Sequence, residues 1–226
     1  MAAEQEGRLE RIVEHAPDTR SLFLRLPAPL AFQPGQFVSC LLPVRGEILI
    51  RPYSIASPPE DGTQLELLLN LVPEGLGSQY LFSRVVGDPI RFTGPWGTFT
   101  LDRAPEAESV FIADGTGIAP IRPMLHRAVA SGGGHRLHLL AATEPGSPAV
   151  YRAEMDALAA RPEARLDVVR VSRAALEDEV RRRWIDADAD RTRRLFVCGI
   201  GPIVPALRDL LRAAGYERRA VQYEKW

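Results

Sequence analysis

The chain has 226 residues, of which 46% are hydrophobic and 25% are charged, and its formal net charge is −1. This length exceeds what one typical domain needs and suits two. The near-neutral balance of charges argues against a protein drawn to nucleic acid or to an anionic membrane.

The first hundred residues contain short stretches of bulky apolar residues bounded by proline or glycine. The predicted strands are Arg8–His15, Thr19–Leu26, Gln36–Leu42 and Gln64–Val72. A helix is expected at about Gly77–Arg84, after an N-capping Ser78 or its neighbour. Strands at this spacing predict a small antiparallel barrel.

The second half of the chain alternates between strands and helices. Its predicted strands are Val110–Ala113, Arg136–Ala142, Leu166–Val171, Leu195–Val197 and Arg219–Tyr223, and its predicted helices are Ile121–Ser131, Ala149–Ala160, Ala174–Trp184 and Ile203–Ala214. Such alternation predicts a parallel sheet covered on both faces. The polar stretch Arg103–Ser109 is the expected linker, so we predict two domains, residues 1–103 and residues 109–226.

The segment Arg51–Ser57, with the sequence RPYSIAS, follows a strand-like stretch and is rich in groups that could bind a cofactor. In an extended chain Arg51 and Tyr53 point to one face and Ser54 to the other. An arginine suits a diphosphate, a tyrosine ring suits stacking, and a hydroxyl suits a ring nitrogen. The segment alone could equally be a strand with a surface arginine.

Two glycine-containing segments follow in the same half. Pro73–Leu81 places glycines before a helix, where the backbone can approach an anion and the helix offers free N–H groups. Gly94–Phe99 is expected to form a tight turn that contains an aromatic residue. Taken singly, these segments could be a helix cap and a closure of the barrel.

The second half carries two further motifs at expected strand ends. Asp114–Pro120 lies between a short apolar strand and a helix, the context that a dinucleotide diphosphate requires. Phe196–Pro202 places Cys198 at the carboxyl end of another parallel strand, where ligands gather in such sheets. Cys198 could otherwise be a small buried thiol in a tight turn.

In chain order, these segments resemble the ferredoxin–NADP(H) reductase superfamily. Phe32–Phe37 is similar to that family's F-x-P-G-Q segment, Arg51–Ser54 to its R-x-Y-S motif, Gly75–Ser78 to its G-x-x-S motif, and Gly94–Phe99 to its G-P-x-G-x-F turn.

The resemblance continues to the C-terminus. Asp114–Pro120 resembles the family's G-G-T-G-I-A-P, with Asp114 in place of the first glycine, and Cys198–Pro202 resembles its C-G-x-x-P loop. The ending Tyr223–Trp226 is similar to that of the flavin/NAD(P)H reductase modules of bacterial oxygenase systems.

The resemblance implies a two-domain β plus α/β fold, with a six-stranded antiparallel flavin-binding barrel followed by a parallel-sheet nucleotide-binding domain. The implied flavin site comprises Arg51, Pro52, Tyr53, Ser54, Asn70, Val72, Gly75, Leu76, Gly77, Ser78 and Trp226. The implied NAD(P)H site comprises Gly115, Thr116, Gly117, Pro120, Glu144, Arg173, Cys198, Gly199 and Pro202. Asn70 stands where the family commonly has a lysine or arginine.

The resemblance also implies catalytic roles for four residues. Ser54 would lie close to the flavin N5, Cys198 would position C4 of the nicotinamide, Glu224 would supply a proton or orient the ring, and Trp226 would stack on the flavin. The implied activity is a flavin-dependent oxidoreductase that moves electrons from NAD(P)H through bound FAD, with FMN as the alternative flavin, to another protein.

The choice of nucleotide stays open, because two residues point in opposite directions. Glu144 follows the second strand of the parallel domain and could accept a hydrogen bond from a free ribose 2′-hydroxyl. Arg173 resembles an arginine that binds the 2′-phosphate in bacterial NADPH reductases. Of the two, we favour NADH.

The two cysteines cannot supply the four thiolates of a plant-type iron–sulfur cluster. We therefore expect a separate acceptor: a ferredoxin, a flavodoxin or an oxygenase component. A basic cluster could meet an acidic carrier or simply be a solvated face; it comprises Arg181, Arg182, Arg183, Arg191, Arg193 and Arg194. The four histidines lack metal-ligand spacing, so no metal is expected.

Two other activities remain open, a reductase that uses free flavin as a substrate and a flavin-binding sensor without turnover. No apolar run approaches the roughly 18 residues that span a bilayer. The polar N-terminus lacks the apolar core of a signal peptide, so a cytoplasmic location is expected.

Overall fold

The computed structural model describes residues 3–60, 62–101, 106–132, 134–147 and 149–226. The chain forms two compact units. Met1–Asp102 with Arg122–Met124 make up the first unit, and Arg103–Ile121 with Leu125–Trp226 make up the second. The predicted linker Arg103–Ser109 falls partly outside the described residues, and Ser109 already begins a strand of the second unit.

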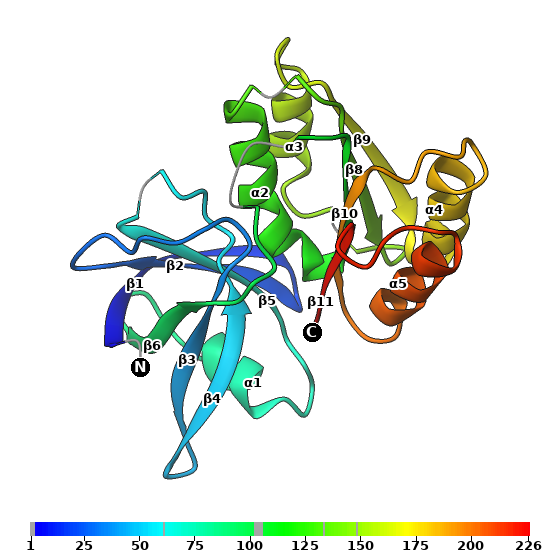
Figure 1. The fold of residues 1–226 in the computed structure, drawn as a ribbon. Coiled ribbons are helices and arrows are strands. Elements are labelled where there is room, and N and C mark those ends of the chain that lie inside the picture. The colour runs from blue at the N-terminus through cyan, green and yellow to red at the C-terminus, as the bar shows by residue number, and fades with distance from the viewer. Residues whose placement is uncertain (1–2, 61, 102–105, 133, 148) are drawn as a thin grey trace. The chain divides into compact units, whose positions relative to one another are not determined.

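The first unit is built on a six-stranded antiparallel sheet in the order β4-β3-β6-β1-β2-β5 (Figure 1). Its strands are β1 (Glu4–Ala16), β2 (Thr19–Arg25), β3 (Phe37–Val44), β4 (Glu47–Ser54), β5 (Gln64–Asn70) and β6 (Pro89–Trp96). An isolated bridge joins Ile55 just after β4 to Leu67 of β5, which lies at the other end of that order. The predicted six-stranded antiparallel architecture is confirmed.

Large apolar side chains, most of them leucine, fill the inside of this sheet. Five of these residues are at most 1% exposed: Leu22, Leu24, Leu65, Leu67 and Phe92. Burying a side chain of this kind contributes roughly 1.5–3 kcal/mol before conformational entropy is counted. The sheet is therefore a rigid support for residues at its edge.

The edge strand β4 carries the R-x-Y-S segment and is paired only with β3. Arg45 and Gly46 connect the two strands with positive φ angles of 54° and 84°, the backbone that a two-residue hairpin turn requires. Pro52 lacks an N–H group, which is tolerated at an edge.

The helix of the first unit, α1 (Leu76–Phe82), packs against β3 and β4. The prediction that Ser78 or its neighbour caps this helix is wrong, because the N-cap residue is Gly75. Ser78 lies inside the first turn instead. The expected turn at Gly94–Phe99 also starts later, since Gly94 and Trp96 still belong to β6.

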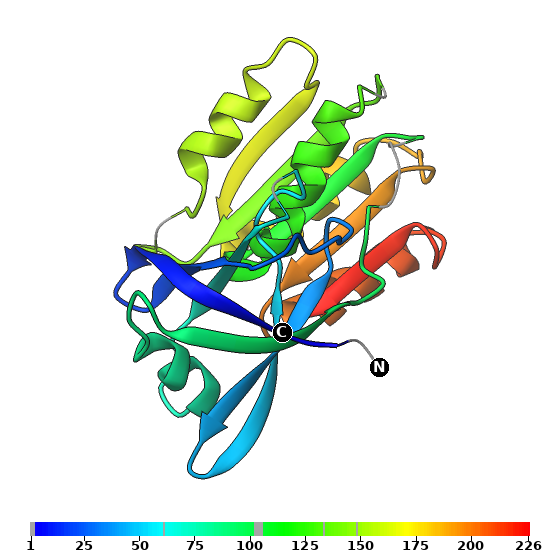
Figure 2. The same cartoon turned by 90° about the vertical axis from the view of Figure 1, so that its left-hand side faces the viewer.

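The second unit is a five-stranded parallel sheet in the order β11-β10-β7-β8-β9, seen side by side in Figure 2. Its strands are β7 (Ser109–Asp114), β8 (Leu137–Thr143), β9 (Leu166–Ser172), β10 (Arg194–Gly199) and β11 (Val221–Lys225). Its helices are α2 (Ile118–Ala130), α3 (Arg152–Ala159), α4 (Leu176–Trp184) and α5 (Ile203–Ala213).

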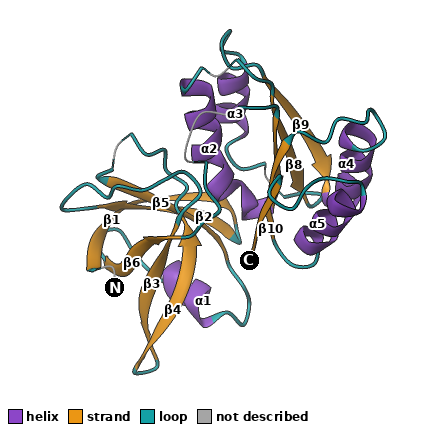
Figure 3. Ribbon diagram, in the orientation of Figure 1, coloured by secondary structure: helices purple, strands orange, loops and turns teal. Residues whose placement is uncertain are grey.

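Helices cover both faces of this sheet, as predicted: α2 and α3 lie on one side and α4 and α5 on the other (Figures 1 and 3). In its core, the rings of Phe111 and Phe196 stack with their centroids 5.0 Å apart. The strand order reverses between β7 and β10, and such a reversal is where parallel sheets bind ligands, beyond the carboxyl ends of the strands.

No helix in the described part of the chain is both long enough and apolar enough to cross a lipid bilayer.

Candidate functional site

In the first unit, Arg51 and Tyr53 of β4 lie beside Gly77 of α1. A Cβ on Gly77 would stand 2.9 Å from Arg51 Cγ and 3.6 Å from the Tyr53 hydroxyl. Only a glycine therefore leaves room for the stem of Arg51 against the helix. The R-x-Y-S and G-x-x-S motifs, some twenty residues apart in sequence, are brought together as the resemblance implied.

The Arg51 guanidinium is exposed, and its Nη1 donates to the neighbouring Ile50 carbonyl at 2.9 Å. Burial raises the pKa of Tyr53 far above its ordinary value, so this phenol stays neutral and can donate a hydrogen bond. On one side of β4, Arg51 therefore offers a positive charge and Tyr53 offers a neutral hydrogen-bond donor.

Ser54 ends β4 and is only 5% exposed. Its hydroxyl makes no hydrogen bond to any residue that the structure describes. Its oxygen is not one of the buried side-chain atoms that lack a partner, so it reaches the surface, where a ligand at the end of β4 could bond to it.

Ser78 holds the loop before α1 closed. Its hydroxyl accepts a hydrogen bond from the Val72 N–H at 3.0 Å and can donate to the Gly75 carbonyl at 2.9 Å. The Gly75 N–H in turn donates to the Val72 carbonyl at 2.9 Å. Ser78 therefore shapes the loop, and its hydroxyl is already engaged.

Three other predicted flavin residues have fewer groups available to bind a ligand. The Asn70 amide donates to the Thr19 hydroxyl at 2.6 Å, which commits it within the sheet. Val72 is 54% exposed and presents an apolar surface. Leu76, the first residue of α1, is half-buried.

In the second unit, the two predicted nucleotide motifs touch at the reversal of strand order. A Cβ on Gly117 would lie 2.2 Å from the Cys198 carbonyl oxygen, and a Cβ on Gly199 would lie 2.7 Å from the Asp114 Cβ. Both positions thus require glycine because backbone from β7 and β10 packs too closely for a side chain.

The elements around this contact match the expected strand–loop–helix pattern. Gly115–Gly117 form a single 3-10 turn centred on Thr116, and α2 begins directly after it. Pro120 lies in the first turn of α2, and Pro202 is the N-cap residue of α5. Proline is tolerated at both places, where its missing N–H costs nothing.

Cys198, Glu224 and Trp226 gather at the ends of β10 and β11. Cys198 is fully buried and pairs in register with Glu224. The Trp226 N–H donates to the Gly199 carbonyl at 3.1 Å, and the Gly201 N–H donates to the Trp226 carbonyl at 3.3 Å. The C-terminal residue is therefore tied to the loop after β10.

Burial raises the pKa of the Glu224 carboxyl to about 7 and raises that of the Cys198 thiol well above its ordinary value. The Glu224 Oε2 is buried and has no hydrogen-bond partner among the described residues. Near neutral pH the thiol is protonated and the carboxyl is half-protonated.

An ion-pair cluster occupies the ends of β7, β8 and β9. Arg173 donates from Nε to Asp114 Oδ1 at 2.7 Å and from Nη1 to Glu144 Oε1 at 2.5 Å. The Asp114 side chain is 2% exposed, and its Oδ2 has no hydrogen-bond partner among the described residues. Sequence reasoning placed Glu144 and Arg173 in the nucleotide site but missed the link to Asp114, since Asp114 and Arg173 are 59 positions apart.

The basic cluster, which from sequence could either meet an acidic carrier or be a solvated face, is not a free positive patch. Arg182 and Arg183 both bind Glu179, at 2.6 and 2.5 Å, and Arg181 lies 3.7 Å from Glu177. Arg191 donates to backbone carbonyls, Arg193 is buried against Asp188, and Arg194 lies over the Phe196 ring. The solvated-face interpretation fits these pairings better than docking.

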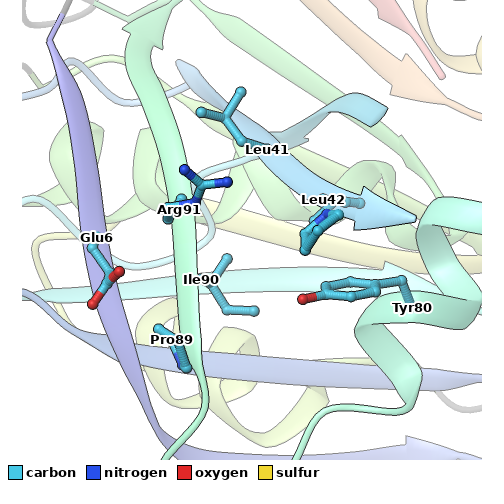
Figure 4. Close-up of a pocket in the computed structure, with 8 residues that line it drawn as sticks. Glu6, Leu41, Leu42, Tyr80, Pro89, Ile90 and Arg91 are labelled. Atoms are coloured by element: carbon cyan, nitrogen blue, oxygen red, sulfur yellow. The ribbon is translucent and has the colours of Figure 1, made fainter. Parts of the chain in front are cut away.

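A separate cavity of about 130 Å³ opens in the first unit between β3, β6 and α1 (Figure 4). Leu42, Ile90 and Tyr80 line it, and the Tyr80 hydroxyl points across it toward Ile90 in the close-up. None of the predicted flavin residues lines this cavity.

Comparison with known proteins finds two successive domain matches. Residues 6–101 match the oxidoreductase FAD-binding domain, and residues 111–209 match the oxidoreductase NAD-binding domain. The chain is 31% identical to ferredoxin–NADP reductase B of Sorangium cellulosum over 98% of its own length and 97% of that protein.

Oxygenase components and solved structures are also similar. The chain is 31% identical to the toluate 1,2-dioxygenase electron transfer component of Pseudomonas putida, of which it spans 59%. A ferredoxin NADP⁺ reductase from Neisseria gonorrhoeae superposes with a TM-score of 0.83 at 18% identity, covering 100% of this chain and 99% of that one. At that identity the likeness shows the fold alone.

Proposed function

We propose that this chain, which belongs to the ferredoxin–NADP reductase family of oxidoreductases, passes electrons from NAD(P)H through FAD to a separate protein carrier. It has an FAD-binding domain followed by an NAD-binding domain. The observation that carries this proposal is the backbone contact between Gly117 and Cys198, which joins the two nucleotide motifs where the strand order reverses. The Sorangium and Pseudomonas relatives, a ferredoxin reductase and an electron transfer component, support a protein carrier as the acceptor.

The residues of the first unit fit an FAD on two observations. Gly77 lets Arg51 and Tyr53 of β4 pack against the start of α1, and the Ser54 hydroxyl at the end of β4 bonds to no described residue. Arg51 would bind the diphosphate, Tyr53 would contact the ring system, and Ser54 would face its reactive nitrogen. FAD, when bound, accepts a hydride from the nicotinamide and releases its electrons to a carrier.

In the second unit, the turn Gly115–Gly117 and the start of α2 would hold the nucleotide diphosphate. Cys198 would position the nicotinamide, because a neutral buried thiol offers a small apolar contact at the end of β10. Glu224 would hold a proton beside it. The protein's own contribution is alignment and exclusion of water.

We propose NADH as the preferred donor, on the charges at the ends of β7, β8 and β9. Arg173 is bound by two carboxylates, Asp114 and Glu144, so the cluster carries a net charge of −1. A 2′-phosphate beside Glu144 would be repelled, whereas a ribose 2′-hydroxyl could donate a hydrogen bond to it.

Replacing Glu144 by glutamine should raise kcat/KM for NADPH relative to NADH by about five- to tenfold, because it removes about 1 kcal/mol of like-charge repulsion at a partly solvated site. Steady-state kinetics with both nucleotides measure this ratio. Glu163→Gln, an exposed carboxylate of the same unit, is the control and should leave the ratio unchanged. An unaltered ratio in Glu144→Gln would remove Glu144 from nucleotide choice.

An absorbance spectrum of the purified protein, before and after anaerobic NADH, tests the proposed function. We expect one FAD per chain and bleaching of its visible bands. Protein that retains no flavin yet reduces added flavin would support a free-flavin reductase instead. Bound flavin that NADH and NADPH both fail to bleach would support a sensor without turnover.

A cytoplasmic location completes the proposal. That compartment supplies reduced nicotinamide nucleotides, and both Cys40 and Cys198 are free and buried rather than joined in a disulfide. Fractionation with antibody detection would test it.

A further inference from the structure

Arg173 is held over the glycine turn that follows β7. The Nη2 of its guanidinium lies 3.5 Å from the point that a Cβ on Gly115 would occupy. Gly115 has φ +57° and begins the 3-10 turn Gly115–Gly117. A residue distant in sequence therefore places a cation against the loop that would hold a phosphate.

The N–H groups of Arg173 Nη2, which make no bond to a described residue, lie beside the turn Gly115–Gly117. A guanidinium carries five N–H donors, and the bonds from Nε to Asp114 and from Nη1 to Glu144 use two of them. No hydrogen bond of Nη2 to a described residue is found, and Nη2 is the nitrogen beside Gly115. The Nη1 edge, by contrast, is already occupied by the Glu144 carboxylate.

Asp114 needs this arginine if an anion is to bind next to it. The Asp114 side chain is 98% buried, its Oδ2 has no hydrogen-bond partner among the described residues, and it directly precedes the turn. An uncompensated carboxylate there would repel a phosphate strongly in a site of low dielectric. The bond from Arg173 Nε neutralises that charge and fixes the guanidinium in place.

We infer that Arg173 is a ligand of the dinucleotide diphosphate rather than of a 2′-phosphate, and that Asp114 is the positioning residue that holds it there. This inference rests on the proposed nucleotide site in the second unit. It also accounts for an aspartate at the position where the family motif has a glycine. Arg173 then contributes to binding NADH and NADPH alike.

Calorimetric titration of the full-length protein with NAD⁺, NADP⁺ and ADP-ribose tests the inference without measuring turnover. For Arg173→Gln we expect all three affinities to fall by a similar factor, about 10- to 100-fold, as for loss of one charge-assisted hydrogen bond. ADP-ribose is included because it carries the diphosphate without a nicotinamide or a 2′-phosphate.

Two further variants separate this role from a structural one. Asp114→Asn/Arg173→Gln removes both charges, so it should recover part of the affinity that Arg173→Gln loses, because no bare carboxylate then faces the diphosphate. Arg219→Gln, which changes an exposed arginine of the same unit that is bonded to Glu217, is the control and should bind like the wild type.

Loss of NADP⁺ affinity alone in Arg173→Gln would overturn the inference in favour of a 2′-phosphate contact. Unchanged affinity for all three ligands, or a double variant no better than Arg173→Gln, would overturn it in favour of a structural brace. Wild-type protein that binds none of the three would instead refute the proposed nucleotide site on which the inference depends.

Discussion

Replacing Ser54 by alanine is expected to slow the reduction of bound flavin by NADH about 10²- to 10³-fold, the usual effect of removing a preorganised donor at a reacting centre. The reason is geometric: Ser54 is only 5% exposed at the end of β4, and no described residue bonds to its hydroxyl. Because the rigid sheet holds Ser54 in place, the hydroxyl needs no reorganisation when a ligand meets it. Anaerobic stopped-flow absorbance measures the rate directly.

The flavin content of Ser54→Ala should stay close to one per chain, since Arg51 and the loop before α1 remain intact. Ser54→Thr keeps a hydroxyl and should retain much of the rate. Ser39→Ala changes a serine of the neighbouring strand β3 and should reduce at the wild-type rate. A Ser54→Ala protein that is reduced as fast as the wild type would exclude the serine from the chemistry.

The architecture could be predicted from the sequence because its signals are local. The alternation of apolar strands and helices located every strand and α-helix of the second unit to within a few residues. In the first unit β4 was recognised only as a strand-like stretch, because its apolar residues Ile48 and Ile50 face solvent at an exposed edge, 50% and 56% exposed. An edge strand that shows apolar side chains to water has no clear pattern of burial.

Strand β6 (Pro89–Trp96) was not predicted. The other errors concern side-chain partners, which no local pattern reports. Ser78 was expected to cap α1, but its hydroxyl bonds to Val72 and Gly75 from within the first turn. Hydrogen-bonding residues near a helix start favour several neighbouring positions. The choice among them depends on the loop before the helix, which only the folded chain defines.

Charges that look alike in sequence also differ in their partners. The arginines of α4 suggested a docking patch, yet Glu177 and Glu179, one turn away, bind them. Spacings of three and four residues could have revealed these pairs. No such rule connects Arg173 with Asp114, because their contact depends on the order of β7, β8 and β9 in the sheet.

Replacing Glu224 by glutamine is expected to make the protein more stable at pH 8, by at most about 3 kcal/mol, and no more stable at pH 4. Burial raises the pKa of this carboxyl from 4.5 to about 7 in the folded protein. The unfolded chain therefore loses its proton first as the pH rises. Stability falls between pH 4.5 and 7, and the full penalty applies above pH 7. Glutamine has no proton to lose, so the variant avoids that penalty.

Denaturant unfolding at intervals from pH 4 to pH 8 measures the difference. Glu217→Gln, which removes the same charge from an exposed turn, is the control and should follow the wild-type profile. If Glu224→Gln and the wild type differed equally at all pH values, the carboxyl would not titrate in this range, and it could not hold a proton beside Cys198 at neutral pH. A buried carboxyl that holds a proton near pH 7 must destabilise the folded protein once it ionises. The stability profile therefore tests the proposed role of Glu224 without any measurement of turnover.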